Sequence, residues 1–589
     1  MKVDAKQTKE YQDLITEARK RYKLAFDADR ESRRDGMDDM KFAVVPGEQW
    51  TTAQKKARGN RPCYEFNKIR VTGKRIINGM RDSRPAGKVI GTEDSDKDTA
   101  EVFEGLIRNI WTHGGDTITD NAAEYQVFAG YGAWRVNTDY VSDDVFEQDI
   151  ILEPIPNPFN LFSDPTSLDV LKRDSGYWFL TSTITSEEFE EQYKGKEKCS
   201  FEESEFDDDG DWWEGDTVRI TEYWYKKQTT KQIWQLKDGR VVDDITGISK
   251  ANINRDREVK INEIWFTIMS GNAVLETPQK WAGTKFPFVP VYGEYYIIDG
   301  KTYWSGITRP AKDPQRSYNT SRTSVTETIA MAPQAKYWAT PHQAEGHEEH
   351  WKTAHSHNYP FMLYNSDPEA PGAPPRMGSA DIPIALIQES QISAEEINMV
   401  TGIYQADVGG ASASTSGRHE IAKQHAGSLA TFNYQDNLAN AVEYTYEILI
   451  DLIPKVYDTQ RSIRVLGADD AEKFVTVNAV GDDEVIAHDL TVGKYDVTVK
   501  TGPNFTTKRQ EAADTYQGLL QGNPEMFPLI GDLIFKSMDL PYAEEIAQRL
   551  RVMAPEPIQQ MLNDETELPP EGMAAMQQAE MAMGQVQEK

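Results

Sequence analysis

The spacing of apolar and polar residues predicts helices near the start of the chain, strands after Gly132 and long helices in the second half. Residues 9–35 form a charged helical stretch, and residues 64–82 repeat apolar positions at helical spacing. Residues 99–128 predict two helices that separate at the sequence HGGD (113–116), because glycine commonly ends a helix.

Alternation of apolar and polar residues replaces this pattern from Gly132 onwards. It predicts strands at 133–141 and 146–155, a Pro- and Asn-rich loop at 156–167, and a strand-rich region at 217–298. Helices and strands combined in this way indicate an α+β fold for this part of the chain.

Helical spacing returns at 305–332, at 384–403 and from Ser416 to Ile453, where we expect Pro454 to end the helix. Residues 333–383 are rich in Pro, His and Gly, with short strands expected at 335–339 and 360–364. Strands at 461–466, 473–477 and 494–500 and short helices at 507–563 follow, and the Met- and Gln-rich end is either a helix that needs neighbours or a disordered tail.

The helix expected at 305–332 has few apolar residues, so we expect it to bury little within its own monomer. Such a helix either packs against lateral partners or is an ordinary amphipathic surface helix. The next helix ends before an unusual sequence, GGASASTSGRHEIAKQH (409–425). Its glycines allow positive φ and low stiffness, and Ser416 can cap the helix that follows.

The charge balance is strongly acidic, with 64 Lys and Arg against 95 Asp and Glu and a net charge of −31. This argues against a protein that grips DNA phosphates, although it is compatible with simple solubility or with a protein that surrounds DNA without holding it. Two cysteines form no disulfide framework and indicate a reducing compartment. We expect no signal peptide in MKVDAKQTKEYQDL and no membrane span, because no run of 18 apolar residues occurs.

Motifs for nucleotide binding, zinc proteolysis and serine hydrolysis are absent from the sequence. The acidic run at 202–216 approaches an EF-hand pattern but lacks its first Asp and last Glu, so a solvated loop is favoured over a calcium site. Clustered histidines are compatible with a metal site or with a polar loop, and we favour the loop; they are His342, His347, His350, His355 and His357.

The segment 416–458 resembles the corresponding segment of podovirus portal proteins of the P22-like family. That family carries a small-residue loop followed by a spaced set of residues, here Ser416, Gly417, Ile421, Gln424, Gly427, Asp436, Asn437, Leu438, Ile453 and Pro454. Further similar segments follow in the same order along the chain, among them GEQW (47–50), RPCYEFNKI (61–69), AGYGAWRVNTDY (129–140), ILEPIPNPFNLFSDP (151–165) and GKYDVTVKTGPNFTTKRQEAA (493–513).

This resemblance implies a portal fold with an α/β wing, a two-helix stem, a small α/β clip, a long kinked wing helix and a short helical crown. The implied boundaries are 1–304 for the N-terminal wing, 305–332 and 384–404 for the stem helices, and 333–383 for the clip. A channel loop follows at 405–417, then the long helix and C-terminal wing strands at 418–504, the crown at 505–565 and a tail at 566–589.

The resemblance further implies a homo-oligomeric ring, expected to contain twelve copies, at one capsid vertex. Double-stranded DNA passes through it without sequence-specific binding during packaging and ejection. The implied partners are the terminase large subunit, tail adaptor or head-completion proteins, and the major capsid and scaffolding proteins. The expected location is the virion, after assembly in the host bacterial cytoplasm. We expect no catalytic residue, cofactor or metal.

Candidate site residues follow from this layout. A DNA-channel loop is expected to comprise small and polar residues with a single cation: Gly409, Gly410, Ser412, Ser414, Thr415, Ser416, Gly417 and Arg418. Carboxylates that either face the channel or pair with Arg316 or Arg322 of a neighbouring subunit are Glu327, Glu389, Glu395 and Glu396. Aromatic residues of the clip that either contact partners or form a local core are Trp351, Tyr359, Phe361 and Tyr364.

Two other functions remain open from sequence alone. A metal-dependent phage hydrolase or nuclease would use the acidic run, with Asp207 and Asp209 as its ligands. A monomeric virion scaffold or adaptor would form no ring.

Overall fold

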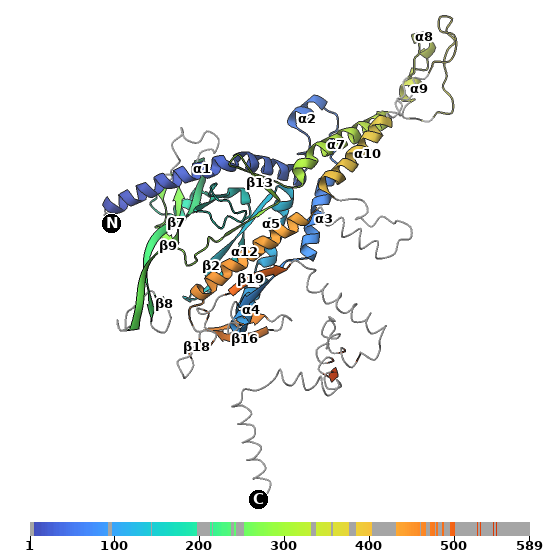
Figure 1. Ribbon diagram of the computed structural model, residues 1–589. Coiled ribbons are helices and arrows are strands. Elements are labelled where there is room, and N and C mark those ends of the chain that lie inside the picture. The colour runs from blue at the N-terminus through green and yellow to red at the C-terminus, as the bar shows by residue number, and fades with distance from the viewer. Residues whose placement is uncertain are drawn as a thin grey trace. The chain divides into compact units, whose positions relative to one another are not determined.

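The computed structural model describes a mixed helix and strand architecture (Figure 1). The described residues are 5–91, 97–142, 144–196, 213–214, 216–236, 241–242, 252–271, 273–331, 337–354, 357, 359–375, 384–402, 431–459, 461–466, 472–477, 479–480, 486–487, 490 and 495–500, with 527, 531, 546 and 549–550. The chain divides into two units, residues 1–81 with 85–500 and residues 82–84 with 501–589. The elements below lie in the first unit, apart from Asp82 at the end of a helix.

The described part of the first 155 residues contains five helices and three strands, and of these α2 and β1 were not predicted from the sequence pattern. The helices are α1 (Ala5–Val44), α2 (Thr52–Arg58), α3 (Lys68–Asp82), α4 (Lys97–Thr112) and α5 (Gly115–Phe128). α4 and α5 separate at Gly114, which confirms the break expected at HGGD. The amphipathic spacing of α4 places its apolar stripe, Phe103, Leu106, Ile107 and Ile110, in the core.

α1 is anchored to the rest of the unit through Arg33. Its guanidinium donates to Asp29 and, at 2.7 Å each, to the carbonyl oxygens of Phe159 and Leu161. α1 bends at Asp29, whose φ of −121° and ψ of 17° depart from helical values. A buried guanidinium that satisfies two main-chain carbonyls fixes the path of the chain on both sides of the contact.

The strands pair antiparallel in six sheets. The largest has the order β10–β9–β7–β5–β4, and β6 and β8 add to β7 and β11 to β9. Its strands are β4 (Leu161–Ser163), β5 (Tyr177–Thr185), β6 (Trp213–Glu214), β7 (Thr217–Leu236), β8 (Val241–Val242), β9 (Ile253–Ser270), β10 (Ala273–Val274) and β11 (Gln279–Lys280). The region 156–167, expected to be a loop, contains η2 (Pro158–Asn160) as well as β4.

The other sheets are smaller and complete the body of the unit. One has the order β12–β2–β3, formed by β12 (Phe288–Tyr292), β2 (Tyr131–Tyr140) and β3 (Gln148–Pro154). Four are two-stranded: β1 (Ala86–Gly91) with β19 (Tyr495–Lys500), β13 (Glu294–Ile298) with β14 (Lys301–Ser305), β15 (Arg461–Leu466) with β16 (Glu472–Val477), and β17 (Ala479–Val480) with β18 (Ile486–Ala487). A short helix, α6 (Ser186–Gln192), follows β5.

The largest core cluster of the described residues connects α3, α4, α5, β2 and β12 with α12 (Phe432–Val456), and smaller clusters lie around β5, β14 and α6. The five apolar positions of α12 that set its predicted spacing, Leu438, Val442, Tyr446, Leu449 and Ile453, are all buried. The prediction that Pro454 ends this helix is wrong, because α12 continues to Val456. Proline removes one amide donor, but the Tyr457 amide still donates to the Ile453 carbonyl oxygen at 2.9 Å and closes the last turn.

Two helices frame the remaining part of the chain, α7 (Thr308–Met331) and α10 (Ile384–Thr401). They confirm the helices expected at 305–332 and 384–403. Between them lie α8 (Pro341–Ala344) and α9 (Glu348–Thr353). The strand expected at 360–364 is wrong, because these residues form irregular chain held by contacts to the two short helices.

Candidate functional site

The antiparallel pair of α7 and α10 is the first part of the candidate site, and its contact face is made of small and polar side chains. α10 packs along α7 and buries Ser390, Ser393, Ile397 and Thr401. The hydroxyl of Ser317 on α7 donates to the Glu389 carboxylate on α10 at 3.0 Å. Small side chains allow the two helix backbones to approach closely, so α7 and α10 pack as one antiparallel helix pair.

α7 is seated on the body of the unit by side-chain amides. We call this contact the polar seat: Gln49, Gln315 and Asn319 together with the main chain of Phe66 and Lys68. Gln315 and Asn319 are fully buried, and their carbonyl oxygens accept the amides of Lys68 at 3.0 Å and Phe66 at 2.9 Å. Gln315 also donates to the Phe66 carbonyl oxygen, and Asn319 donates to Gln49.

A buried ionic contact lies next to the polar seat. The carboxylate of Asp39 on α1 is fully buried and lies 2.6 Å from both Arg309 and Lys312 of α7. Burial raises the pKa of Asp39, whereas hydrogen bonds and charge from Lys312 and Arg309 act in the opposite direction. Removing the carboxylate would leave two cations in a poorly hydrated contact, so Asp39 is needed to hold α7 against α1.

The expectation that the 305–332 helix buries little in its own monomer is therefore wrong. The helix buries polar side chains that find partners in the same chain. A sequence signal existed, because Gln315, Asn319 and Thr323 recur every four residues and so share one helix face. The burial of that stripe was not predicted, because sequence alone does not place the donors and acceptors of residues 64–68 beside it.

Most of the side chains that α10 buries are small and polar, whereas several large apolar side chains of this helix are exposed. Its outer face carries large apolar side chains, including Ile384 at 71% exposure, Ile392 and Met399 at 65% exposure. Glu389, Glu395 and Glu396 are exposed on the same helix. Exposed apolar residues that form a row, rather than occurring singly, indicate a contact surface. Whether the three carboxylates face a channel or a neighbouring subunit stays a prediction.

Glu327, the fourth predicted carboxylate, binds Arg58 of α2, and both side chains are largely buried. α2 is thereby tied to α7 within one chain. The cation of this pair was not among the partners considered from sequence, because nothing in the sequence places residues 52–58 beside 327.

The four aromatic residues expected in 333–383 divide into two pairs. Trp351 donates to the Leu363 carbonyl oxygen at 2.9 Å and packs against Tyr337, and Tyr359 stacks on His350 at a centroid distance of 4.4 Å. Phe361 and Tyr364 are exposed. Trp351 and Tyr359 therefore stabilise the segment through contacts within it, whereas Phe361 and Tyr364 are largely open to solvent. A role for any of the four in binding a partner remains a prediction.

Several predicted residues lie outside the described residues, namely the loop residues 409–418, His355, and the acidic run 202–216 apart from 213–214 and 216. Among the described residues no group of three or more His, Cys, Asp or Glu side chains is arranged to hold a metal ion. The described helices include none that is both long and apolar enough to cross a membrane.

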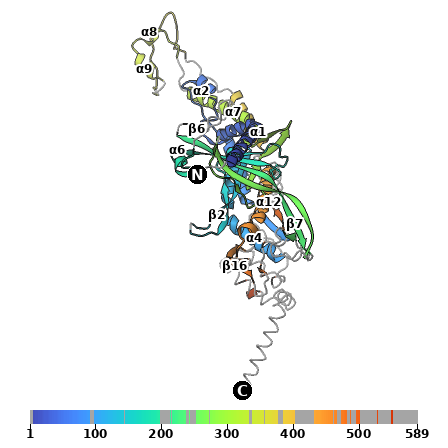
Figure 2. The same ribbon diagram turned by 90° about the vertical axis from the view of Figure 1, so that its left-hand side faces the viewer.

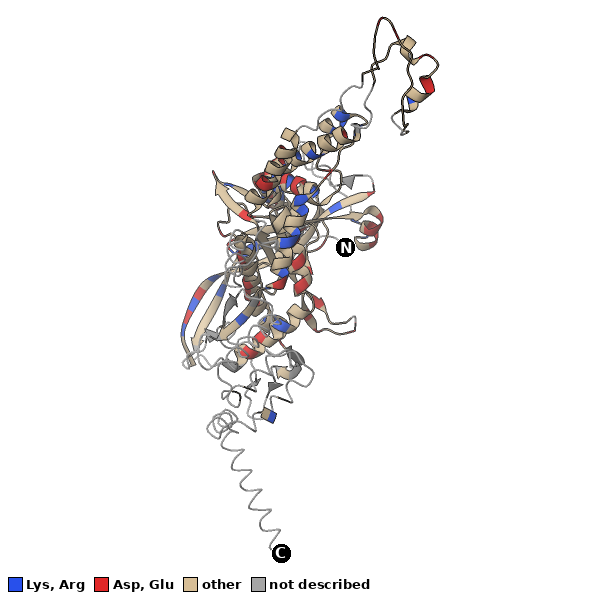
Figure 3. Ribbon diagram, turned by 90° about the vertical axis from the view of Figure 1, so that its right-hand side faces the viewer, with Lys and Arg blue, Asp and Glu red and all other residues tan. Residues whose placement is uncertain are grey.

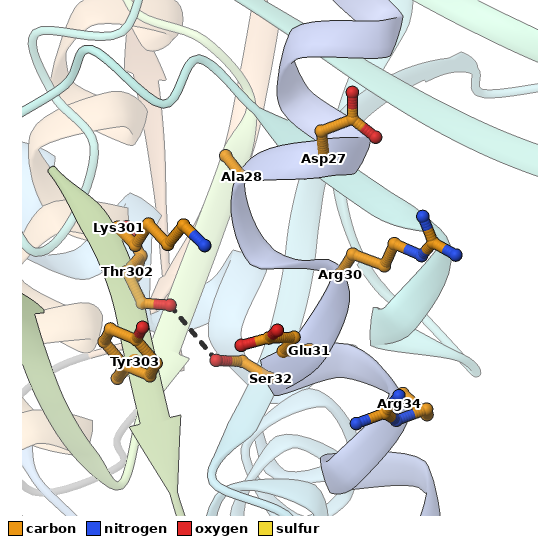
Figure 4. Close-up of a pocket in the computed structure, with 9 residues that line it drawn as sticks. All are labelled: Asp27, Ala28, Arg30, Glu31, Ser32, Arg34, Lys301, Thr302 and Tyr303. Carbon is orange, nitrogen blue, oxygen red and sulfur yellow. Dashed lines mark hydrogen bonds between the residues drawn. The ribbon is translucent and has the colours of Figure 1, made fainter. Parts of the chain in front are cut away.

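A cavity of about 320 Å³ lies where α1 bends, against β14 (Figure 4). Its walls carry Arg30, Arg34 and Lys301 but also Asp27 and Glu31, and the Ser32 hydroxyl donates across its base to the Thr302 carbonyl oxygen. Charges of both signs at one small opening give no consistent preference for an anion or a cation. The cavity therefore belongs to the packing of α1 rather than to a ligand site.

Comparison with known proteins identifies the family of the chain. The model of the phage P22-like portal protein family matches residues 19–589. The chain belongs to the P22-like phage portal protein family. It is also 26% identical over 535 residues to the portal protein of Acyrthosiphon pisum secondary endosymbiont phage 1, a match that covers 83% of this chain and 73% of that protein.

Family membership confirms the function predicted from sequence at the level of the family. P22-like portal proteins are structural virion proteins that assemble as a ring at the capsid vertex, and viral DNA is packaged and ejected through that ring. The chain is thus a capsid component and a head-to-tail connector. Neither the hydrolase nor the monomeric scaffold considered from sequence gains support from these matches.

Proposed function

We propose that twelve copies of this chain form a ring in which the α7–α10 pair is the stem that surrounds the DNA. The observation that carries this proposal is the exposure of large apolar side chains on α10, which presents Ile384, Ile392 and Met399 to the outside of the monomer. An apolar row of this kind is costly in water, and a neighbouring copy packed laterally against it would remove the cost.

In this arrangement residues 333–383 form the clip, at the far end of the stem from the wing. Its internal contacts would keep Phe361 and Tyr364 available for the terminase large subunit during packaging and for tail adaptors afterwards. Aromatic residues of this size supply much contact area at low conformational entropy cost, which suits a surface that serves successive partners.

The loop 405–417 is proposed to line the channel, and residues 418–504 and 505–565 to form the C-terminal wing and the crown. Small hydroxyl side chains and glycine can exchange hydrogen bonds with passing phosphates without a fixed charge. Net negative charge on the wall would repel DNA from all sides, whereas a basic wall would bind each phosphate and slow the movement. The ring needs no catalytic group, and we propose that it assembles in the host cytoplasm with capsid and scaffolding proteins.

The channel loop provides the direct test. Replacing residues 409–415 with bulky side chains is expected to leave ring formation intact but to reduce DNA packaged per shell in a reconstituted system. A matched control keeps the loop composition by rearranging the order of the glycine, alanine, serine and threonine residues within 409–415. Unchanged packaging by rings that contain the bulky loop would contradict the assignment of the channel loop.

A further inference from the structure

The long hairpin of β7 and β9 extends well past the rest of its sheet. β5 pairs with β7 as far as Tyr225, and the pairs of β9 with β10 and β11 involve residues 265–270. Residues 227–236 and 253–262, here called the ribbon, therefore form a two-stranded structure to which β8 adds only at Trp234 and Gln235. A two-stranded ribbon is marginal in water by itself, so an external partner would stabilise it.

One face of the ribbon is basic although the chain as a whole is acidic. Residues opposite each other in an antiparallel pair share a face, and the register pairs Lys231 with Val259, Ile233 with Arg257 and Gln235 with Arg255. We call this set the basic face; it also includes Lys227, Thr229 and Ile261, and at its base Glu263 stands opposite Lys227 and pairs with Lys280. The carboxylates of the ribbon, Asp256 and Glu258, lie on the other face.

A feature of opposite character lies at the tip of the β2–β3 hairpin. Residues 139–149, here called the acidic tip, contain five carboxylates and no Lys or Arg. Phe146 is 96% exposed at its end, next to exposed Val145 and Val141. The tip is ordered by its own main chain, since the Val141 amide donates to the Glu147 carbonyl oxygen at 3.0 Å.

The two features belong to one body and leave it on opposite sides. Arg135 of β2 forms ion pairs with Glu153 of β3 at 2.5 Å and with Glu222 of β7 at 2.9 Å, which ties both hairpins together. In Figures 2 and 3 the β2–β3 hairpin and the β7–β9 ribbon point away from each other at a similar height. Figure 3 shows both blue and red bands along the ribbon, and the strand register assigns them to its two faces. Two complementary surfaces on opposite sides of one molecule fit a head-to-tail contact that can repeat around a ring.

We propose that the acidic tip of one copy docks on the basic face of the ribbon of the next copy. The carboxylates Asp144 and Glu147 then meet Lys231, Arg255 and Arg257, and Phe146 packs on Ile233, Val259 and Ile261. This inference rests on the proposed ring and adds to it a specific contact in the wing, separate from the stem. The charges set the orientation and the apolar residues supply the buried area.

Cysteine cross-linking of the full chain tests the contact directly. In a background with Cys63→Ser and Cys199→Ser, the pair F146C and V259C is expected to give a ladder of disulfide-linked copies under mild oxidation. Each single variant is expected to give none, and the pair F146C with K260C, on the opposite face of the ribbon, is the matched control. Rings in electron micrographs without a ladder would overturn the contact but leave the ring intact. Absence of both would count against the contact and the proposed function together.

Charge-reversal variants provide a second test of the proposed contact. Arg257→Glu or Glu147→Lys is expected to lower the yield of the ladder about tenfold at low salt, and the two together are expected to restore it. Lys260→Glu is expected to leave the yield unchanged. If Arg257→Glu instead leaves the ladder unchanged and abolishes binding of the ring to duplex DNA, the basic face serves DNA and the proposal is wrong.

Discussion

At the scale of single residues, the attachment of α7 depends on side-chain amides in positions where apolar residues are usual. Gln315 and Asn319 satisfy the main chain of residues 66–68, and Asp39 satisfies two cations. Buried polar groups of this kind contribute little net energy when paired but cost much when one partner is lost. The polar seat therefore specifies one position of α7 against the body.

Substitution of Gln315 tests this directly. Gln315→Leu leaves the Lys68 amide without its acceptor and the Phe66 carbonyl oxygen without a donor, at a cost of about 1–3 kcal/mol for each unsatisfied group. Hydrogen exchange measured by mass spectrometry should show faster exchange of the Lys68 amide. Thr320→Val, on the exposed side of the same helix, is the control and should leave that amide protected. Equal protection in both variants would contradict the role of the seat.

Acid sensitivity of the segment 337–375 follows from one carboxylate. The hydroxyl of Thr340 and the amide of Glu369 donate to Asp367 and hold the pKa of Asp367 below its ordinary value of 3.8. A carboxyl group whose pKa is lowered on folding stabilises the fold above its ordinary pKa, and the contribution disappears as pH falls through the lowered value. Protection factors in this segment should therefore drop below about pH 4. In Thr340→Val the pKa of Asp367 should lie closer to its ordinary value, so the drop between neutral and acid pH should be smaller, and an unchanged profile would be the contrary result.

At the scale of elements, close packing of α3 against α5 depends on one glycine. A Cβ at Gly73 would overlap the ring of Phe128, which is fully buried and cannot move aside. Gly79, one and a half turns later in the same helix, has open space around its Cα and no positive φ. The two positions separate the effect of packing from that of helix propensity.

Opposite outcomes are expected for alanine at these two positions. Gly73→Ala should destabilise the first unit by about 1–3 kcal/mol through overpacking. Gly79→Ala should stabilise it by up to about 1 kcal/mol, because alanine is the better helix former. The midpoint of thermal unfolding measures both. A rise in midpoint for Gly73→Ala would show that the α3–α5 contact is looser than described.

The exposed apolar side chains of α10 lead to a prediction about ring assembly rather than about the stability of the monomer. Met399→Lys changes a side chain that is 65% exposed, so the monomer should fold as before. A charge in a lateral helix contact should nevertheless reduce the fraction of rings in gel filtration by about tenfold or more. Met399→Leu keeps an apolar side chain at the same position and serves as the control, and equal ring fractions for Met399→Lys and Met399→Leu would contradict an apolar contact at Met399.

The sequence pattern predicted elements well where burial follows periodicity, as for α4, α5, β2, β3 and α12. It failed where the partner of a residue lies far away in the chain. The burial of Gln315 and Asn319 was not predicted, because the main chain of residues 66–68 could not be placed beside them from sequence. The region 217–298 was expected to be rich in strands, but the length of β7 was not predicted. The structure shows one strand of 20 residues, because the exposed ribbon needs no apolar face there.

At the scale of the whole molecule, the net charge of −31 and the basic face of the ribbon have separate consequences. An acidic wall suits a conduit through which DNA slides, and a local basic face suits a contact with an acidic tip. In the proposed assembly the helix pair, the ribbon and the tip each contribute a contact. Identical chains then close around a hole that admits a DNA duplex.

Electron microscopy of the purified full-length chain, alone and after co-expression with its shell proteins, tests this ring closure most directly. We expect rings of one stoichiometry, with a central opening at least as wide as a DNA duplex and with the α7–α10 pairs around it. A single species of 66.7 kDa under every condition, with no rings in any field, would contradict the account.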